Sequence, residues 1–290
     1  MNILIGGADG YNWSQLKNWV LSSKVFDGKR VLLTYRMDDT TKKKCLEHGV
    51  ELVEINHDIY GQPLNHDARV NVGAARTVSH EIRYFHAWQY LKEQTDGKYV
   101  VLTDTRDVIF QQDPIPFLER KLDDNWAEFM RRTLLAPQEG ILYKDEPWNA
   151  NNMYQGYGGY VWEEMQNLPV YNCGTIAGIL PDFANIVFAL WSMTTGKHTY
   201  PADQCSFGIL AEKTLRGSTY RCEHDEGWCA QVGATADPHK KEMWSNLITP
   251  QPMMQEDGYV YTSEGKKFCL VHQYERNPEW LRIIDGRYKE

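Results

Sequence analysis

Short apolar runs alternate with helix-forming stretches through the first third of the chain. Residues 2–5, 30–35 and 50–55 are rich in Val, Ile and Leu and have the length of strands. Residues 13–21 and 40–48 lie between these runs and have the polar and apolar spacing of helices. Because parallel strands need a crossover connection, this alternation predicts an α/β domain with a mainly parallel central sheet.

A glycine-rich segment follows the first apolar run. Its sequence, Gly6-Gly-Ala-Asp9-Gly-Tyr11, is typical of a flexible loop that exposes its backbone. Such a loop after the first strand is how a nucleotide-binding half begins. Gly6, Asp9 and Tyr11 are therefore candidates for nucleotide contacts.

A strong helical pattern covers about residues 77–93. Val78, Ile82, Phe85 and Leu91 lie near one stripe of this helix. Arg76 and Arg83 are seven residues apart, so two helical turns place them on one face. They could meet phosphate there, although most arginines in such positions are simply solvated.

The run that ends the next strand is the most informative part of the sequence. After Tyr99-Val-Val-Leu-Thr come two carboxylates, Asp104 and Asp107, with Arg106 between them. Ligands of open α/β sheets collect beyond the carboxyl ends of strands, and hard oxygen ligands favour Mg²⁺ or Mn²⁺ over zinc. The alternative is structural: Asp107 caps the following turn while Asp104 pairs with Arg106.

The rest of the chain has weaker patterns. Residues 137–167 are rich in Trp, Tyr, Asn and Gly and are expected to form a long, mobile binding loop. An apolar segment at 170–180 precedes a helix at about 181–194, and Asp203-Gln204 opens a further helix. The carboxy-terminal third of the chain contains short segments. No repeat or linker divides the chain, which favours one domain with a carboxy-terminal extension.

Composition narrows the classes of function. A net charge of −8 argues against nucleic-acid partners, and 10 Trp with 17 Tyr exceed what a core needs. The six cysteines lack zinc spacing and are interpreted as free thiols. The sequence shows neither a signal peptide nor a run of transmembrane length, so we expect a cytoplasmic protein without a membrane span. Oligomeric state is left open.

The order of these features resembles the GT-A-fold glycosyltransferases, which combine a nucleotide-sugar donor with an acidic metal motif. The residues that carry the resemblance are Arg83, Asp104, Asp107, Asn172-Cys-Gly174, Asp203-Gln204 and His272. It spans about residues 1–280 and is strongest to the small glycosyltransferases of chloroviruses, a xylosyltransferase among them. The resemblance implies one domain over 1–290, with a nucleotide-binding half to about 110 and an acceptor-binding half from about 111.

The resemblance also implies roles for individual residues. Asp107 and His272 would hold Mn²⁺ or Mg²⁺, while Asp104 would be either a second ligand or a ribose contact. Arg76 and Arg83 would support the phosphates or donor sugar of a UDP-sugar, and Asn172 with Gly174 would contact the sugar. Asp203 would be the base in an inverting enzyme or would steady the donor in a retaining one.

The metal motif departs from the family pattern. Thr105 stands where the first acid of Asp-x-Asp would be, and Asp104 takes over one position earlier. Arg106 is an unusual neighbour for a cation, and we expect it to point away.

Simpler roles remain open for several of these residues. His272 could be a hydrogen-bonded core histidine, Asn172 part of a tight turn, and Asp203 only a helix cap. At least one ring among Trp148, Trp228 and Tyr160 is expected to line the acceptor site.

Two other functions compete with sugar transfer to a glycan. A sugar-nucleotide nucleotidyltransferase would need a basic residue in the Gly6–Gly10 loop, which has none. A carbohydrate-binding module with calcium fits the length and the strand–helix alternation poorly.

Overall fold

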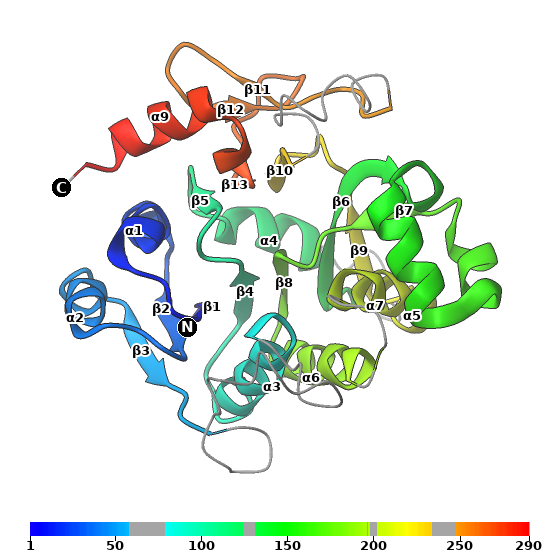
Figure 1. Ribbon diagram of the computed structural model, residues 1–290, viewed down its shortest axis with the longest axis horizontal. Helices are drawn as coiled ribbons and strands as arrows, with labels where there is room; N and C mark the ends of the chain where they lie inside the picture. Colours follow the sequence, from blue (N-terminus) through cyan, green and yellow to red (C-terminus); the bar gives the residue numbers. More distant parts are fainter. Residues whose placement is uncertain (58–78, 124–130, 196, 198–201, 234–246, 290) are drawn as a thin grey trace.

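The computed structural model describes residues 1–57, 79–123, 131–195, 197, 202–233 and 247–289 (Figure 1). Its helices are α1 Trp13–Ser22, α2 Asp39–Glu47, α3 Ser79–Leu91, α4 Ile115–Leu122, α5 Pro147–Met165, α6 Asp182–Thr194, α7 Asp203–Ile209 and α9 Pro278–Arg287. Its strands are β1 Ile3–Ala8, β2 Lys29–Thr34, β3 Glu51–Glu54, β4 Tyr99–Thr103, β5 Val108–Phe110, β6 Leu134–Leu142, β7 Pro169–Tyr171, β8 Thr175–Ile179, β9 Thr219–Cys222, β10 Cys229–Gln231, β11 Met253–Met254, β12 Val260–Tyr261 and β13 Leu270–His272.

An eight-stranded sheet forms the centre of the molecule. Its strand order is β3-β2-β1-β4-β8-β6-β7, with β9 paired to β6. The four strands β3, β2, β1 and β4 run parallel, whereas β8 and β7 are antiparallel to their neighbours. The predicted mixed, mainly parallel α/β fold is therefore confirmed.

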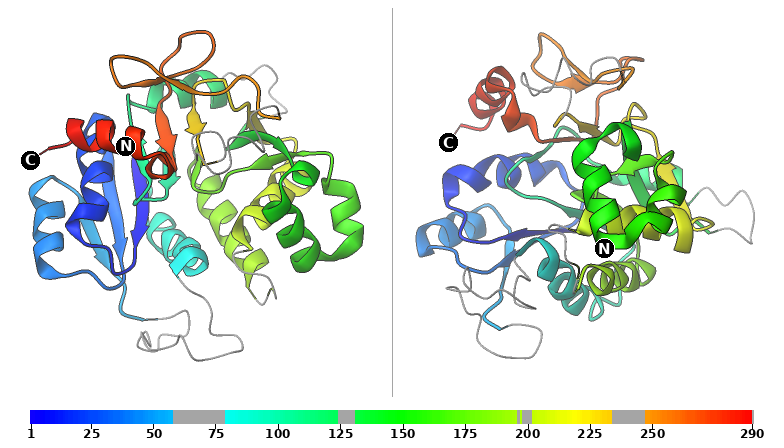
Figure 2. Two further views of the ribbon diagram at one scale, coloured as in Figure 1. Left: turned by 45° about the horizontal axis from the view of Figure 1, so that its top comes forward. Right: turned by 45° about the vertical axis from the view of Figure 1, so that its right-hand side comes forward.

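Helices cover both faces of this sheet, because successive side chains of a buried strand point to opposite sides. In β1, Leu4 packs with the core that includes Trp19 of α1, while Ile3 and Ile5 pack with the core that includes Tyr84 of α3. Figure 2 shows the resulting layers, with α1 and α2 on one side and α3 and α6 on the other.

A smaller sheet closes one end of the molecule. Its order is β10-β13-β5, and β5 follows directly after the acidic loop that leaves β4. Val108 of β5 pairs with His272 of β13. The carboxy-terminal segment is fixed against α1, where the Asn18 amide donates to Tyr274 Oη (3.0 Å) and Asp285 Oδ1 (2.8 Å). This sheet brings the end of the chain to the end of β4.

The expected long loop at 137–167 is wrong. Strand β6 continues to Leu142, and the 19-residue α5 follows. Glu146 caps α5 by accepting from Asn149 N (2.6 Å), and Met153 and Met165 are buried in its packing. The glycines misled the prediction because Gly158, whose φ of 80° is not helical, divides α5 into two consecutive helical pieces joined by a kink instead of starting a loop.

The remaining secondary-structure predictions need smaller corrections. The first strand extends through the glycines to Ala8 instead of ending at residue 5. The helix expected at 77–93 is α3, and residues 77 and 78 lie outside the described part of the chain. All six cysteines are buried and free, as expected. Among the described residues, no helix is both long and apolar enough to cross a bilayer.

Candidate active site

The loop after β4 is fixed on both sides by neighbouring strands. The Asp104 amide donates to the Gly174 carbonyl (2.8 Å), and the Thr105 hydroxyl donates to the Gly7 carbonyl (2.8 Å). A loop between buried strands must place its polar groups in this way. The carboxylates of Asp104 and Asp107 therefore leave a rigid edge of the sheet.

Three side chains from this loop and from β13 converge. One ligand atom each of Asp104, Asp107 and His272 lies within 4.8 Å of the others. His272 Nε2 is 3.4 Å from Asp104 Oδ2 and 3.8 Å from Asp107 Oδ2. His272 is 2% exposed, and its Nε2 has no hydrogen bond. The set fits a divalent cation, since carboxylate oxygens with one imidazole suit Mn²⁺ or Mg²⁺.

The orientation of His272 is set by a residue that the sequence analysis missed. His272 Nδ1 lies 2.8 Å from Gln231 Oε1, and the Gln231 amide donates to Thr175 Oγ1 (2.9 Å). A carbonyl oxygen at Nδ1 requires a proton there, which leaves the Nε2 lone pair for a metal. Gln231 has no motif around it, and only the pairing of β10 with β13 brings it to His272.

The two carboxylates have their pKa values pushed apart. Burial raises the pKa of Asp104, but the Arg83 charge and His272 outweigh it and hold that pKa well below its ordinary value. Burial also raises the pKa of Asp107, and there the opposing charge of His272 does not restore the ordinary value. Burial lowers the pKa of His272, but the charges of Asp107 and Asp104 raise it by more than burial lowers it, so the net shift of this pKa is upward. A metal ion bound here would therefore compete with protons for Asp107 and His272.

Arg83 connects this cluster to Asp203. Its Nη1 is paired with Asp104 Oδ1. Its Nη2 donates a hydrogen bond to Tyr84 Oη (3.0 Å) and lies 3.7 Å from Asp203 Oδ2. Asp203 also accepts from Tyr84 Oη (3.3 Å) and from Gln204 N (3.0 Å), and it is 5% exposed. Ala202, and not Asp203, is the cap residue of α7.

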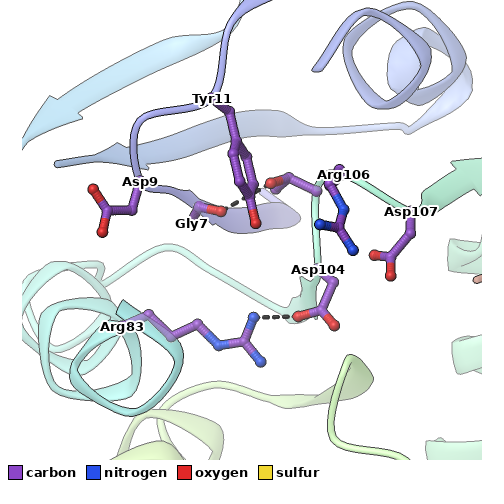
Figure 3. A pocket seen from close by; sticks show the side chains of 8 residues that line it. Gly7, Asp9, Tyr11, Arg83, Asp104, Arg106 and Asp107 are labelled. Atoms are coloured by element: carbon purple, nitrogen blue, oxygen red, sulfur yellow. Dashed lines mark hydrogen bonds and ion pairs between the residues drawn. The ribbon is translucent and has the colours of Figure 1, made fainter. Parts of the chain in front are cut away.

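A cavity of about 170 Å³ adjoins the cluster. Its lining residues are Gly7, Asp9, Tyr11, Arg83, Asp104, Thr105, Arg106 and Asp107. Figure 3 shows Tyr11 and Arg106 reaching into the space above Asp104 and Asp107. The expectation that Arg106 points away is therefore wrong.

The structure places only some of the candidate nucleotide-binding residues near the first strand at the cavity. Asp9 and Tyr11 line the cavity, and Asp9 forms a bidentate pair with Arg36 (2.6 and 2.8 Å). Gly6 does not line it: a Cβ at Gly6 would overlap the methyl group of Thr105, so this glycine makes room for the loop. Gly7 is the glycine at the cavity.

Asn172 and Gly174 lie next to the cluster of Asp104, Asp107 and His272. Asn172 Oδ1 accepts from Gly174 N (2.8 Å), which confirms a tight turn. A Cβ at Gly174 would stand 2.6 Å from Asp104 Oδ2 and 3.0 Å from His272 Cε1. Asn172 also donates to Glu139 Oε1 (2.9 Å), which in turn accepts from Gln204 Nε2 (3.1 Å). Glu139, which the sequence analysis did not single out, joins the two motifs.

The remaining candidates are Arg76 and the three aromatic residues considered for the acceptor site. Arg76 lies outside the described residues. Trp228 is a core residue, 1% exposed, whereas Trp148 and Tyr160 on α5 are 46% and 78% exposed.

Comparisons with known proteins identify the fold. No family model and no curated protein matches the sequence. The galactosyltransferase LgtC, solved with donor and acceptor sugar analogues, is 13% identical with a TM-score of 0.52, covering 99% of this chain and 96% of LgtC. The bifunctional glycosyltransferase WbbM is 12% identical with a TM-score of 0.54, covering 97% of this chain and 49% of WbbM.

The glycosyltransferase GlyE of Streptococcus pneumoniae TIGR4 is 14% identical with a TM-score of 0.50, covering 97% of this chain and 59% of GlyE. At sequence identities this low, the comparison establishes a shared fold but not a shared activity. The chain has the GT-A fold of glycosyltransferases.

Proposed function

We propose that this protein is a metal-dependent glycosyltransferase that moves a sugar from a UDP-sugar to a hydroxyl of a glycan. The observation that carries the proposal is the cluster of Asp104, Asp107 and His272 at the carboxyl end of β4, beside a polar cavity. In an open α/β sheet this edge is where nucleotides bind. The division into a nucleotide half and an acceptor half near residue 110 belongs to the same proposal.

The chemistry requires a diphosphate to leave the anomeric carbon. In this proposal, Asp107, His272 and Asp104 hold the cation, which neutralises charge on the departing diphosphate. Gln231 keeps His272 in the tautomer that can bind a metal. Arg83, buried against Asp104, fixes that carboxylate in place.

Asp203 is proposed as the carboxylate that acts on the sugar or the acceptor. In an inverting reaction it would take the acceptor proton, and in a retaining reaction it would steady the donor. Its bonds to Tyr84 and Gln204 N hold it rigidly, which suits either role. Asn172, Gly174 and Glu139 would shape the sugar subsite behind the cation.

Tyr11 and Asp9 are proposed to contact the nucleoside, because they line the cavity on the side of β1. The resemblance to chlorovirus enzymes makes UDP-xylose the first donor to examine. Arg76 keeps its proposed role on the phosphates from that resemblance alone.

A donor-hydrolysis screen tests the function. Purified protein is incubated with UDP-xylose, UDP-glucose, UDP-galactose and UDP-rhamnose, with Mn²⁺, with Mg²⁺ or with EDTA, and free UDP is measured. We expect release of UDP from one donor that depends on the cation. Titration of UDP by calorimetry, with and without Mn²⁺, gives a second readout.

Two results would support other functions. Release of pyrophosphate from UTP and a sugar phosphate would make the protein a nucleotidyltransferase. Binding of sugars that is unaffected by any nucleotide would make it a carbohydrate-binding module.

A further inference from the structure

Arg106 is the one arginine of the cavity wall, among the described residues, with an accessible guanidinium. It lies between Asp104 and Asp107 on the loop, and its side chain is 50% exposed. The carboxylate nearest to it is Glu275, whose Oε1 is 3.8 Å from Arg106 Nη2. Glu275 is itself only 25% exposed, but this contact is long and half of the Arg106 side chain is in solvent, so Arg106 can turn to another anion.

Arg83, the other arginine of the cavity, is already engaged. Its side chain is 9% exposed, its Nη1 is paired with Asp104, and its Nη2 donates to Tyr84 Oη (3.0 Å). A guanidinium has a fixed number of donors in one plane. Both Nη atoms of Arg83 are engaged, and its Nε, which has no hydrogen bond, is buried, so Arg83 presents little of its guanidinium to the cavity.

The charges around the cavity indicate which group remains to bind a phosphate. Two carboxylates, Asp104 and Asp107, would balance a bound divalent cation, and Asp203 lies against Arg83. A terminal phosphate brings about 1.5 to 2 negative charges at pH 7. Arg106 is the cavity-lining group that can meet this additional charge.

Its position suits that role. Figure 3 shows the Arg106 side chain beside Asp107 and Tyr11, over the same space that the carboxylates face. The loop beneath it is fixed by Thr105 and Asp104, so the guanidinium starts from a rigid base. Arginine binds phosphate oxygens through two parallel N–H groups, which a lysine cannot do.

We propose that Arg106 binds the terminal phosphate of the nucleoside diphosphate, the phosphate from which the sugar departs. This inference rests on the proposed function. When the bond from the anomeric carbon to the phosphate oxygen breaks, the electron pair stays on that oxygen, and Arg106 stabilises the charge. The acceptor oxygen forms the new bond to the anomeric carbon and gives its proton to Asp203 in an inverting reaction, or to the departing phosphate oxygen in a retaining one. Arg106 thus distinguishes a diphosphate from a monophosphate.

Nucleotide binding tests the proposal. The affinities of ADP, CDP, GDP, TDP and UDP are measured with Mn²⁺, and the tightest is compared with its monophosphate in wild type and in Arg106→Gln. Loss of a charge-assisted hydrogen bond predicts about 10- to 100-fold weaker diphosphate binding. The monophosphate should change less than about twofold, and Arg106→Lys should fall between wild type and Arg106→Gln.

A matched control removes the same charge elsewhere. Arg216 is exposed and lies in the turn after the helical segment that ends at Thr214, so Arg216→Gln should leave both affinities unchanged. Unchanged monophosphate binding also shows that the Arg106→Gln site is folded.

The outcomes separate the two proposals. Diphosphate binding to wild type that is equally tight in Arg106→Gln overturns the role of Arg106 alone, and so does equal weakening of both nucleotides. If wild type binds none of the five diphosphates, the proposed function and this inference both fail.

Discussion

The two walls of the candidate active site contain similar groups, but the charges and hydrogen bonds of these groups are satisfied differently. On the helical wall, formed by Arg83, Tyr84 and Asp203, each charged group has an oppositely charged neighbour inside the protein. On the loop wall, formed by Arg106, Asp107 and His272, the imidazole Nε2 has no hydrogen bond and Arg106 has only a distant carboxylate.

This difference indicates how to separate scaffold from ligand site. A charge that is paired inside the protein contributes rigidity, whereas a polar group without a close partner can bind a ligand. Variants of the loop wall should therefore change ligand binding more than stability. Variants of the helical wall should change stability as well.

The largest effect is expected from the loop wall. Asp107→Ala removes a proposed metal ligand whose charge no neighbour replaces. We expect cation-dependent donor hydrolysis to fall by about 10³-fold, since a metal contributes several kcal/mol to a developing diphosphate charge. Initial rates over a Mn²⁺ titration measure the change.

Asp182→Asn is the control for this prediction. Asp182 begins α6 outside the cavity, so its variant should keep the wild-type rate. Turnover by Asp107→Ala within about tenfold of wild type, with the same Mn²⁺ dependence, would remove Asp107 from the metal site.

Asp203→Asn tests whether a residue of the helical wall also takes part in the chemistry. If Asp203 is the base, transfer should fall by about 100-fold. Donor affinity with Mn²⁺ should then stay near wild type. Since variants of this wall are expected to change stability in either case, donor affinity decides: a purely structural role would lower donor affinity together with transfer.

The sequence predicted the parts of this site that depend on local patterns. The apolar run of β4 and the two acids after it require only a short stretch of chain, and the strand–helix alternation before it is equally local. Placing His272 beside Asp107 came from the family resemblance. The spacing of 165 residues between them contains no such information.

The parts that failed depend on contacts between distant segments. Arg106 was expected to point away because its positive charge makes it an unusual neighbour for a cation, but the fold of the loop turns it to the cavity. Gln231 meets His272 only through the parallel pairing of β10 with β13. Helix α5 was missed because packing of Met153 and Met165 outweighs the low helix propensity of its glycines.

A third prediction concerns Glu81, which supports the helical wall from α3. Glu81 Oε1 accepts from Ala202 N (3.1 Å), directly before Asp203, and the residue is 6% exposed. Burial raises its pKa from 4.5 to about 7. The unfolded chain therefore loses this proton first as pH rises, so ionisation between about pH 4.5 and 7 favours unfolding.

Glu81→Gln removes this cost while keeping an oxygen that can accept from Ala202. Relative to wild type, the variant should gain stability as pH rises from 4.5 to 7, reaching about 3 kcal/mol above pH 7. Below pH 4.5, where the wild-type carboxyl is neutral, the difference should vanish. Urea unfolding at several pH values measures it, and a difference independent of pH would contradict the assignment.

The smallest effect is expected at the edge of the helical wall, where the acceptor would arrive. Trp148 is 46% exposed and precedes Asn149, whose Oδ1 accepts from Gln204 Nε2 (3.1 Å). A ring that stacks on the acceptor sugar contributes about 1 kcal/mol, so Trp148→Ala should raise the acceptor KM roughly fivefold without changing the donor KM. Tyr160→Ala, which removes another exposed ring from the same helix, is the control and should change neither. Kinetics with p-nitrophenyl glycosides as acceptors measure both variants, and an acceptor KM of Trp148→Ala equal to that of wild type would remove this ring from the acceptor subsite.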